Sequence, residues 1–400
     1  MIGQAHRQRR GAAAVAATVR VRLAAALAAC GRPPLRDPAA YRRLGAGAWH
    51  DAYRVTAADG RRLVVRLRKP VIYGRREPFD ERALHTDYAG VGAYYAAANE
   101  CRPGICPAAY AYHISPALSC TVESYLGPAL VLGRLTPGSA VAIGRAAGVC
   151  FRAMDEWRPP WPGWGELVWT PEGLRGEDAR PLGAILAAEA AAWRDGLDRL
   201  VAAGYAFDHA AARAMLDRAL AGRADAPAPP SLVNGDISPE NLIVRRGRFV
   251  GLIDPVPALG DGARYAAFFL LCYRLLLPAL HDAPRYARHH FDRHAPALAH
   301  IADGFEAGYV GDDPALARAI GREYFLWVLD LAVAAHDMLG QPVDEERRLR
   351  TGGKEAIARR VRRYVAALTH PPTPSLSQFW EREGEQVRGR SGWGGEDAAE

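Results

Sequence analysis

Three polar residues lie in or beside two short apolar segments in the second half of the chain. Asp236 and Asn241 are separated by four residues, and Asp254 follows a second apolar segment that ends at Ile253. A compact loop can aim the Asp236 carboxylate at a substrate hydroxyl while Asn241 folds back beside it. Asp254 then enters the same space from the second strand of a hairpin. Asn241 and Asp254 are hard oxygen donors that suit Mg²⁺, which takes few protein ligands and shares the rest with phosphates and water.

The remaining carboxylate, Asp236, is free to accept a proton from that hydroxyl. This division of roles meets the demands of phosphoryl transfer, in which charge neutralisation by metal and positioning of the nucleophile supply most of the catalysis. The plainer interpretation is that Asp236 and Asn241 only cap turns, which both residue types do well. Three spaced donors, a following Gly260-Asp261 and a glycine-turn sheet earlier in the chain favour the catalytic interpretation.

An aspartate, four spacers and an asparagine, followed by an aspartate beyond a hairpin, form the kinase catalytic pattern. Here the sequence resembles the aminoglycoside phosphotransferase family of protein-kinase-like small-molecule kinases. The usual family string is His-Gly-Asp, four residues and Asn, and Asn234 replaces the His in this chain. The resemblance implies an α+β, bilobal protein-kinase-like fold. Its N-lobe is a small antiparallel sheet with one main helix, and its larger C-lobe is mostly helical.

The segment from Tyr41 to Pro70 has the pattern of three strands joined by two turns. Gly45 and Gly47 would let the backbone approach a phosphate between the first two strands. The resemblance puts Arg66, on the third strand, where the kinase lysine contacts the nucleotide phosphates. Lys69 is the second candidate for this contact.

An acid from the following helix, expected from about Asp80 to Asn99, should orient this cation. Asp87 lies inside that helix and is the preferred candidate, with Glu81 near the helix start as the alternative. The stretch from Glu123 to Tyr125 resembles the hinge whose backbone binds adenine in the family. As plain sequence, the same stretch is simply the end of a strand.

The formal net charge of +7 resides in the first 36 residues, which contain seven arginines and no acid. The rest of the chain therefore carries 44 charges of each sign. A basic surface that binds nucleic acid should be spread over a folded domain, so nucleic-acid binding is not expected. We expect residues 1–36 to be a flexible extension whose removal leaves activity intact.

The remaining residues divide into three parts. We expect 37–126 to be the nucleotide-binding N-lobe and 127–370 to be a helical C-lobe with the catalytic loop and the acceptor site. Composition rich in Pro, Ser, Gly and charge predicts a disordered tail over 371–400.

No targeting or membrane-spanning segment is expected. The longest apolar candidates fall short of the roughly 18 residues that a transmembrane helix needs. The apolar stretch before Cys30 is at the lower limit of the roughly 7 to 15 residues that an export signal needs and is mostly alanine, so export is not expected. The six cysteines lack metal-ligand spacing and are expected to be buried thiols. We therefore expect a cytoplasmic protein, and the sequence indicates no protein partner.

Acceptor specificity should come from the helical C-lobe. Glu323, Asp330 and Asp337 are seven residues apart and share a helix face, with Trp327 beside it. An acidic face would attract an amine-bearing acceptor, although a solvated face is the more common explanation. Four tryptophans in a proline-rich stretch favour either loop packing or an aromatic wall for a ligand. They are Trp157, Trp161, Trp164 and Trp169.

The sequence therefore predicts a small-molecule O-phosphotransferase that uses Mg²⁺ and ATP or GTP. Its acceptor would be a hydroxyl of a small molecule such as an aminoglycoside-like antibiotic. The alternatives are a metabolite kinase of the choline, homoserine or fructosamine type and a non-catalytic nucleotide-binding pseudokinase. A protein kinase would need Ala-Pro-Glu and His-Arg-Asp motifs, and neither occurs. A role in antibiotic resistance and a biosynthetic role both stay open.

Overall fold

The computed structural model divides into two compact units whose segments are interleaved in the sequence. The residues that it describes are 17–37, 40–225 and 229–369. Unit 1 comprises residues 1–131, 153–179 and 230–260. Unit 2 comprises residues 132–152, 180–229 and 261–400. Asp236, Asn241 and Asp254 thus belong to the same unit as the glycine-turn sheet.

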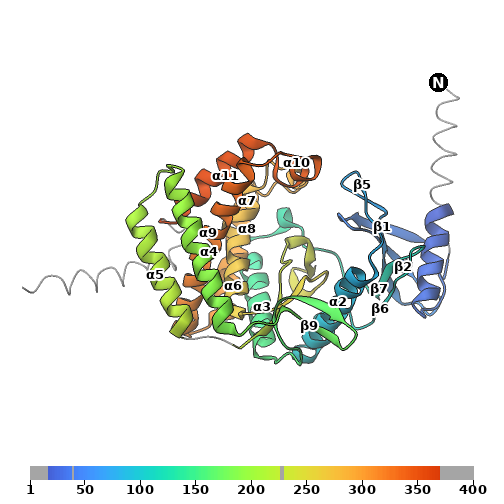
Figure 1. Ribbon diagram of the computed structural model, residues 1–400. Helices are drawn as coiled ribbons and strands as arrows, with labels where there is room; N and C mark the ends of the chain where they lie inside the picture. The colour runs from blue at the N-terminus through green and yellow to red at the C-terminus, as the bar shows by residue number, and fades with distance from the viewer. Residues whose placement is uncertain (1–16, 38–39, 226–228, 370–400) are drawn as a thin grey trace, which may run out of the picture. The chain divides into compact units, whose positions relative to one another are not determined.

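Unit 1 contains a five-stranded antiparallel sheet in the order β1-β2-β3-β7-β6 (Figure 1). Its strands are β1 (Tyr41–Ala46), β2 (His50–Thr56), β3 (Arg62–Arg68), β6 (Tyr110–His113) and β7 (Cys120–Ser124). The predicted tight turn joins β2 to β3, and Gly60 supplies the left-handed φ of 82° that it needs. Along β3, Leu63, Val65 and Leu67 are buried on one face of the sheet. That alternation gives the sheet an apolar face that must be covered.

A helix over residues 17–29 packs against the apolar face of this sheet (Figure 1). Leu23, Ala26 and Leu27 recur at helical spacing and are completely buried. The chain then forms a bridge between Leu35 and Ala57 at the edge of the sheet. The structure therefore corrects the expected flexible extension over residues 17–36, while residues 1–16 lie outside the described part of the chain.

A second sheet of unit 1, in the order β10-β13-β8-β9, carries the segment with the three polar residues. Its strands are β8 (Trp164–Thr170), β9 (Gly173–Asp178), β10 (Ser231–Asn234) and β13 (Pro257–Gly260). Between β10 and β13 lie the short 3-10 turn η2 (Pro239–Asn241) and the predicted hairpin of β11 (Leu242–Arg245) and β12 (Arg248–Leu252). Unit 1 also contains β4 (Val71–Ile72), β5 (Arg75–Arg76) and the predicted helix, α2 (Glu81–Cys101). Asp80 caps α2 by accepting the Ala83 N–H at 2.9 Å.

Unit 2 is mostly helical. Its longer helices are α3 (Pro137–Glu156, whose last residues belong to unit 1), α4 (Leu182–Ala202), α5 (His209–Asp225), α6 (Gly262–Leu271), α8 (Ala295–Val310), α9 (Pro314–Leu339) and α11 (Lys354–Ala367). Shorter turns are η1 (Leu132–Arg134), η3 (Cys272–Leu276), α7 (Leu277–Ala279), η4 (Ala287–His289) and α10 (Glu345–Thr351). Gly144 and Gly148 of α3 face the backbone of α8 so closely that a side chain would clash there.

The fold is α+β, with an antiparallel-sheet N-terminal region, one main helix beside it and a mostly helical C-terminal part, as predicted. Among the residues that the structure describes, no helix has the length and apolar character required to cross a membrane. The tail over 371–400 lies outside the described residues. The domain limits at residues 37, 127 and 371 stay predictions.

Candidate active site

One buried side chain sets the path of the loop that carries Asp236. Asn234 is 1 % exposed, and its Oδ1 accepts the backbone N–H groups of Asp236 and Val256, each at 2.9 Å. The Gly235 N–H also donates to the Val256 carbonyl at 2.8 Å. The segment before Asp236 is thus fastened to the segment just after Asp254, which brings the two acids into one neighbourhood.

Asn241 ends η2 with its side-chain amide turned toward the backbone of both acids. Its Nδ2 donates to the Asp236 carbonyl and to the Asp254 carbonyl, each at 3.4 Å. Because the amide nitrogen is used in this way, Oδ1 remains as the acceptor that can face a cation. The Asn241 carbonyl accepts the Ile253 N–H at 3.1 Å, so the hairpin returns directly beside it.

Asp254 completes a set of oxygen donors. Its φ of 56° lies in the left-handed region, where residues with a side chain are uncommon and functional sites are over-represented. Its side chain is half exposed. Within the described residues, no group of three or more His, Cys, Asp or Glu could hold a metal unaided. One carboxylate and one amide oxygen fit Mg²⁺, which keeps phosphate oxygens and water as further ligands.

The Asp236 carboxylate is held by its own loop. Its Oδ1 accepts the Ser238 N–H at 3.2 Å. Burial raises the pKa of Asp236, and the Asp254 carboxylate adds to this rise, whereas hydrogen bonds from Ser238 and Asn241 oppose it. A carboxylate with a raised pKa is a stronger proton acceptor when it is ionised.

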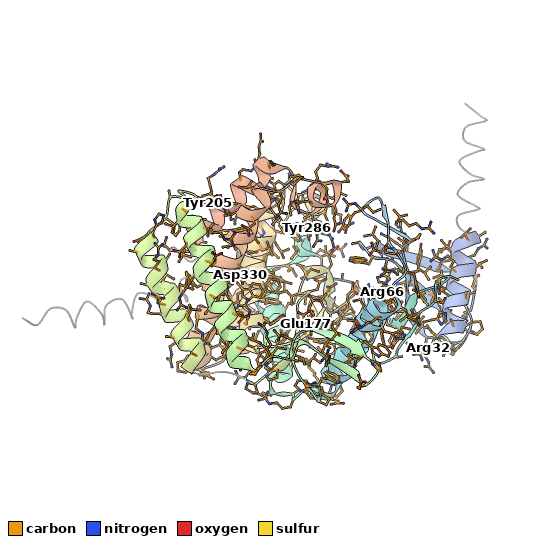
Figure 2. The ribbon with its side chains drawn as sticks, viewed as in Figure 1. Arg32, Arg66, Glu177, Tyr205, Tyr286 and Asp330 are labelled. Carbon is orange, nitrogen blue, oxygen red and sulfur yellow. The ribbon has the colours of Figure 1, made fainter. Side chains whose placement is uncertain are left out.

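Arg66 of β3, which is labelled in Figure 2, contacts two acids, Glu123 and Asp254. Its Nε and Nη2 lie 3.2 and 3.1 Å from Oε1 of Glu123, and its Nη1 lies 3.1 Å from Oδ2 of Asp254. Glu123 is 2 % exposed, so this pair is buried. Burial alone would lower the pKa of Arg66, but the Asp254 and Glu123 carboxylates outweigh it and raise that pKa. A permanently charged guanidinium therefore stands beside the Asp254 carboxylate.

The acid that orients Arg66 comes from β7 and not from α2, so the expected pairing with Asp87 is wrong. Burial raises the pKa of Asp87, and the charge that opposes this rise is that of Arg68. The alternative, Glu81, has its Oε1 4.0 Å from Nε2 of His85.

Instead of an acid, α2 contributes the Tyr95 hydroxyl group, which contacts Glu123 and Asp254. Tyr95 donates to Oε2 of Glu123 at 3.0 Å and accepts the backbone N–H of Asp254 at 3.0 Å. Its side chain is 2 % exposed. Three segments, α2, β7 and the loop after β12, therefore meet at one phenol oxygen.

Gly45 lies near the end of β1, opposite Ala52 of β2, and Gly47 lies in the turn between these two strands. Neither glycine has a left-handed φ, and a Cβ added at Gly45 would have no heavy atom within 4 Å. Lys69 holds this turn, since its Nζ donates to the Gly47 carbonyl and its N–H donates to the Trp49 carbonyl at 2.9 Å. Lys69 thus fastens the turn, while Arg66 is the cation that contacts Asp254.

Gly45→Ala is expected to leave the melting temperature unchanged, because the added methyl group meets no protein atom. If a phosphate packs against this backbone, the same methyl group obstructs it. We expect the KM for the nucleotide to rise about tenfold, or about 1.4 kcal/mol. Gly183→Ala in α4, where a Cβ also meets nothing within 4 Å, is the matched control. An unchanged KM in Gly45→Ala would contradict contact between the turn and the phosphates.

The predicted hinge groups are largely engaged within the protein. The Tyr125 N–H donates to the Arg62 carbonyl at 3.0 Å. The Tyr125 ring lies 5.3 Å from the Arg54 guanidinium and 5.6 Å from that of Arg62. Because the Glu123 carboxylate holds Arg66, neither this side chain nor the Tyr125 N–H is free for a base.

The segment with these features matches a known family. The family model APH, described as the phosphotransferase enzyme family, matches residues 40–259, which is more than half of the chain. The chain belongs to this phosphotransferase family. The resemblance stated from the catalytic pattern is therefore confirmed.

Solved structures similar to this phosphotransferase are distant from it in sequence. An apo thermostable mutant of aminoglycoside phosphotransferase APH(4)-Ia is 16% identical, with 82% of this chain and 95% of that chain covered and a TM-score of 0.46. Macrolide 2′-phosphotransferase MphH from Brachybacterium faecium is 18% identical, with 85% and 95% covered and a TM-score of 0.43. A choline/ethanolamine kinase family protein from Mesorhizobium loti is 16% identical, with 84% and 90% covered and a TM-score of 0.44. No curated protein matches the chain.

Sequence reasoning missed three residues in or beside the candidate site. Asn234 stands where the family has His, and this substitution was a signal in the sequence that the position has a special role. Tyr95 and His50 carried no signal that separates them from core residues. His50 Nε2 lies 2.9 Å from the Tyr88 hydroxyl, and burial lowers the pKa of His50 to about 4. The His50 imidazole is therefore neutral near pH 7.

In unit 2, the acidic side chains of α9 are already paired (Figure 2 labels Asp330). Glu323 is completely buried, and three arginines contact its two oxygens. They are Arg223 at 3.0 Å, Arg322 at 3.3 Å and Arg264 at 3.4 Å. Asp330 contacts Arg264 at 3.1 Å and accepts the Trp193 Nε1 proton at 2.7 Å, and Asp337 pairs with Arg199. Glu323 is therefore buried and neutralised, whereas the Asp337 side chain is 39% exposed, so the three acids form neither a free acidic surface nor a fully solvated one.

The tryptophans of unit 1 form no single wall. Trp157 lies 6.0 Å from Trp161 between ring centroids and donates from Nε1 to Glu100 at 2.9 Å. Trp169 instead stacks on His85 of α2, with ring centroids 4.8 Å apart. Local packing accounts for the contacts of Trp157 and Trp161, whereas Trp169 lines a pocket together with His85 and Glu172.

Proposed function

We propose that this family member is a small-molecule O-phosphotransferase that moves the γ-phosphoryl group of ATP or GTP to an acceptor hydroxyl. One observation carries the proposal: the Asn241 amide binds the backbone of both Asp236 and Asp254. This contact supports the proposal because it ties the backbones of the proposed proton acceptor and the proposed metal ligand together within unit 1. Arg66 supplies a fixed positive charge next to them.

In this proposal Asp236 positions the acceptor hydroxyl and takes its proton. Asn241 and Asp254 would hold Mg²⁺, which neutralises phosphate charge when it is bound. Arg66, oriented by Glu123, contacts the phosphates, and the end of β1 with Gly45 and the following turn with Gly47 cover them. Because the Tyr125 N–H is occupied, base binding at the hinge would rest on neighbouring backbone groups.

The acceptor is a small molecule in this proposal, and an amine on it is not required. The acidic face that would have attracted an amine is neutralised by arginines. An aminoglycoside-like antibiotic and a metabolite such as choline, homoserine or a fructosamine are therefore equal candidates. The structure of unit 2 favours neither.

An ADP- or GDP-release screen with Mg²⁺ tests the proposal. Its panel should include aminoglycosides, aminocyclitols, amino alcohols, nucleosides and macrolides, with mass spectrometry to detect a phosphoryl group on the product. Turnover with any member supports phosphotransfer and identifies the acceptor class. A nucleotide-dependent rise in melting temperature with no turnover on any acceptor would favour the pseudokinase alternative.

The pKa shift of Asp236 predicts the acid limb of the pH profile. A raised pKa means that the carboxylate takes up its proton at a higher pH than an ordinary aspartate, whose value is 3.8. We expect kcat to fall as pH decreases through a value above 3.8, since a protonated Asp236 cannot accept the hydroxyl proton. His50, with a pKa of about 4, stays neutral over most of this range.

The measurement is kcat at saturating substrates from pH 4 upward, with nucleotide affinity followed over the same range. Circular dichroism at each pH separates unfolding from the loss of activity. A kcat that stays constant down to the onset of acid unfolding would contradict the assignment of Asp236 as the base.

A further inference from the structure

The contacts around Arg66 form a closed ring of four residues. Arg66 binds Oε1 of Glu123, and Oε2 of Glu123 accepts the Tyr95 hydroxyl proton. The Tyr95 oxygen accepts the Asp254 N–H, and Oδ2 of Asp254 returns to Arg66 at 3.1 Å. The four residues come from β3, β7, α2 and the loop after β12. A displacement of any one of these residues therefore changes its contacts with its two neighbours in the ring.

Within this ring, Tyr95 binds Asp254, whose φ lies in the left-handed region. The left-handed φ of Asp254 is unfavourable for a residue with a side chain and persists only where its surroundings enforce it. The Tyr95 hydroxyl supplies the acceptor for the Asp254 N–H from a position that is itself 2 % exposed. Without that hydroxyl, the Asp254 N–H would lose its hydrogen-bond acceptor within the protein.

We propose that Tyr95 is a positioning residue, whose hydroxyl holds Asp254 in the backbone conformation that presents its carboxylate to the metal–nucleotide. This inference rests on the proposed function, in which Asp254 is a metal ligand. The helix α2 thus contributes a neutral phenol that positions Asp254, while β7 supplies the acid that orients Arg66. Residues that hold a metal ligand in place commonly contribute 10- to 100-fold to metal affinity or activity.

Tyr95→Phe tests the inference, because it removes the hydroxyl and keeps the ring that packs edge-on against Tyr110 at 5.4 Å. We expect the concentration of Mn²⁺ or Mg²⁺ needed for half-maximal ADP binding to rise at least tenfold. ADP binding in EDTA should not change. With an acceptor in hand, kcat should fall by a similar factor while the acceptor KM stays constant.

Tyr110→Phe is the matched control. The Tyr110 hydroxyl belongs to the same aromatic cluster, and it is buried without a hydrogen-bond partner among the described residues. Its removal should therefore change neither metal dependence nor turnover. Circular dichroism and melting temperature establish that both variants fold.

The outcomes separate this inference from the proposed function. A wild-type protein that binds no metal–ADP and phosphorylates no acceptor overturns both. A wild-type protein that binds metal–ADP, with Tyr95→Phe showing the same metal dependence, overturns the inference alone. A loss of affinity in Tyr95→Phe that is equal with metal and with EDTA also overturns it, because that loss would be structural and independent of Asp254.

Discussion

Asp236→Asn is expected to lower kcat by on the order of 10²- to 10⁴-fold, the contribution of a positioned general base. The amide has nearly the shape of the carboxylate, and its oxygen can still accept the Ser238 N–H that holds the loop. It cannot take up the acceptor proton. The affinity for metal–ADP should stay within about threefold of wild type, since Asn241, Asp254 and Arg66 are unchanged, and this is less than 1 kcal/mol. Single-turnover assays and an ADP titration measure the two quantities.

Glu240→Gln is the control for Asp236→Asn. Glu240 is exposed in the same loop, so this variant removes the same charge without touching the proposed base. Its kcat should match that of wild type. Equal kcat values for Asp236→Asn and wild type would refute general-base catalysis by Asp236.

Leu23→Ala/Leu27→Ala is expected to reduce the free energy of unfolding by several kcal/mol. Each leucine is completely buried against the five-stranded sheet, and such substitutions cost about 2 to 5 kcal/mol apiece through lost burial and the cavity left behind. Neighbouring substitutions are not strictly additive, but their sum approaches the total of about 5 to 15 kcal/mol that stabilises a typical domain. Urea or thermal unfolding measures the change.

Val21→Ala is the control on the same helix, because Val21 is 69% exposed and its loss should change stability little. Removal of residues 1–36 should act like the double variant or more strongly. This reverses the expectation from the sequence that the truncation is harmless. A truncated protein with wild-type stability and activity would show that the helix over 17–29 is dispensable for the sheet.

The misassignment of residues 17–36 as part of a flexible extension has a physical cause. Seven arginines without an acid resemble the composition of an unstructured segment. Composition averages over the helix, whereas burial depends on one stripe of it, and Leu23, Ala26 and Leu27 form that stripe. Only the tertiary structure shows that this stripe packs against the apolar face of the sheet.

The acidic residues of α9 show a second limit of prediction from the sequence alone. Spacing by seven correctly indicated a shared helix face, because that property is local. What the face contacts depends on α4, α5 and α6, which supply Trp193, Arg223 and Arg264. No pattern within α9 could reveal that its carboxylates are neutralised.

By itself, the sequence determined the family, the α+β class and the loop and hairpin that carry Asp236, Asn241 and Asp254. Asp236, Asn241 and Asp254 lie within 19 residues, and turn and hairpin preferences act over that range, so their meeting could be predicted. Only the tertiary structure decided the partners of Arg66. Its contacts with Glu123 and Asp254 span 57 and 188 positions, and which strand or helix supplies the acid is decided by sheet order and packing. The expected acid on α2 was therefore replaced by Glu123 of β7, and the role of Tyr95 became visible with it.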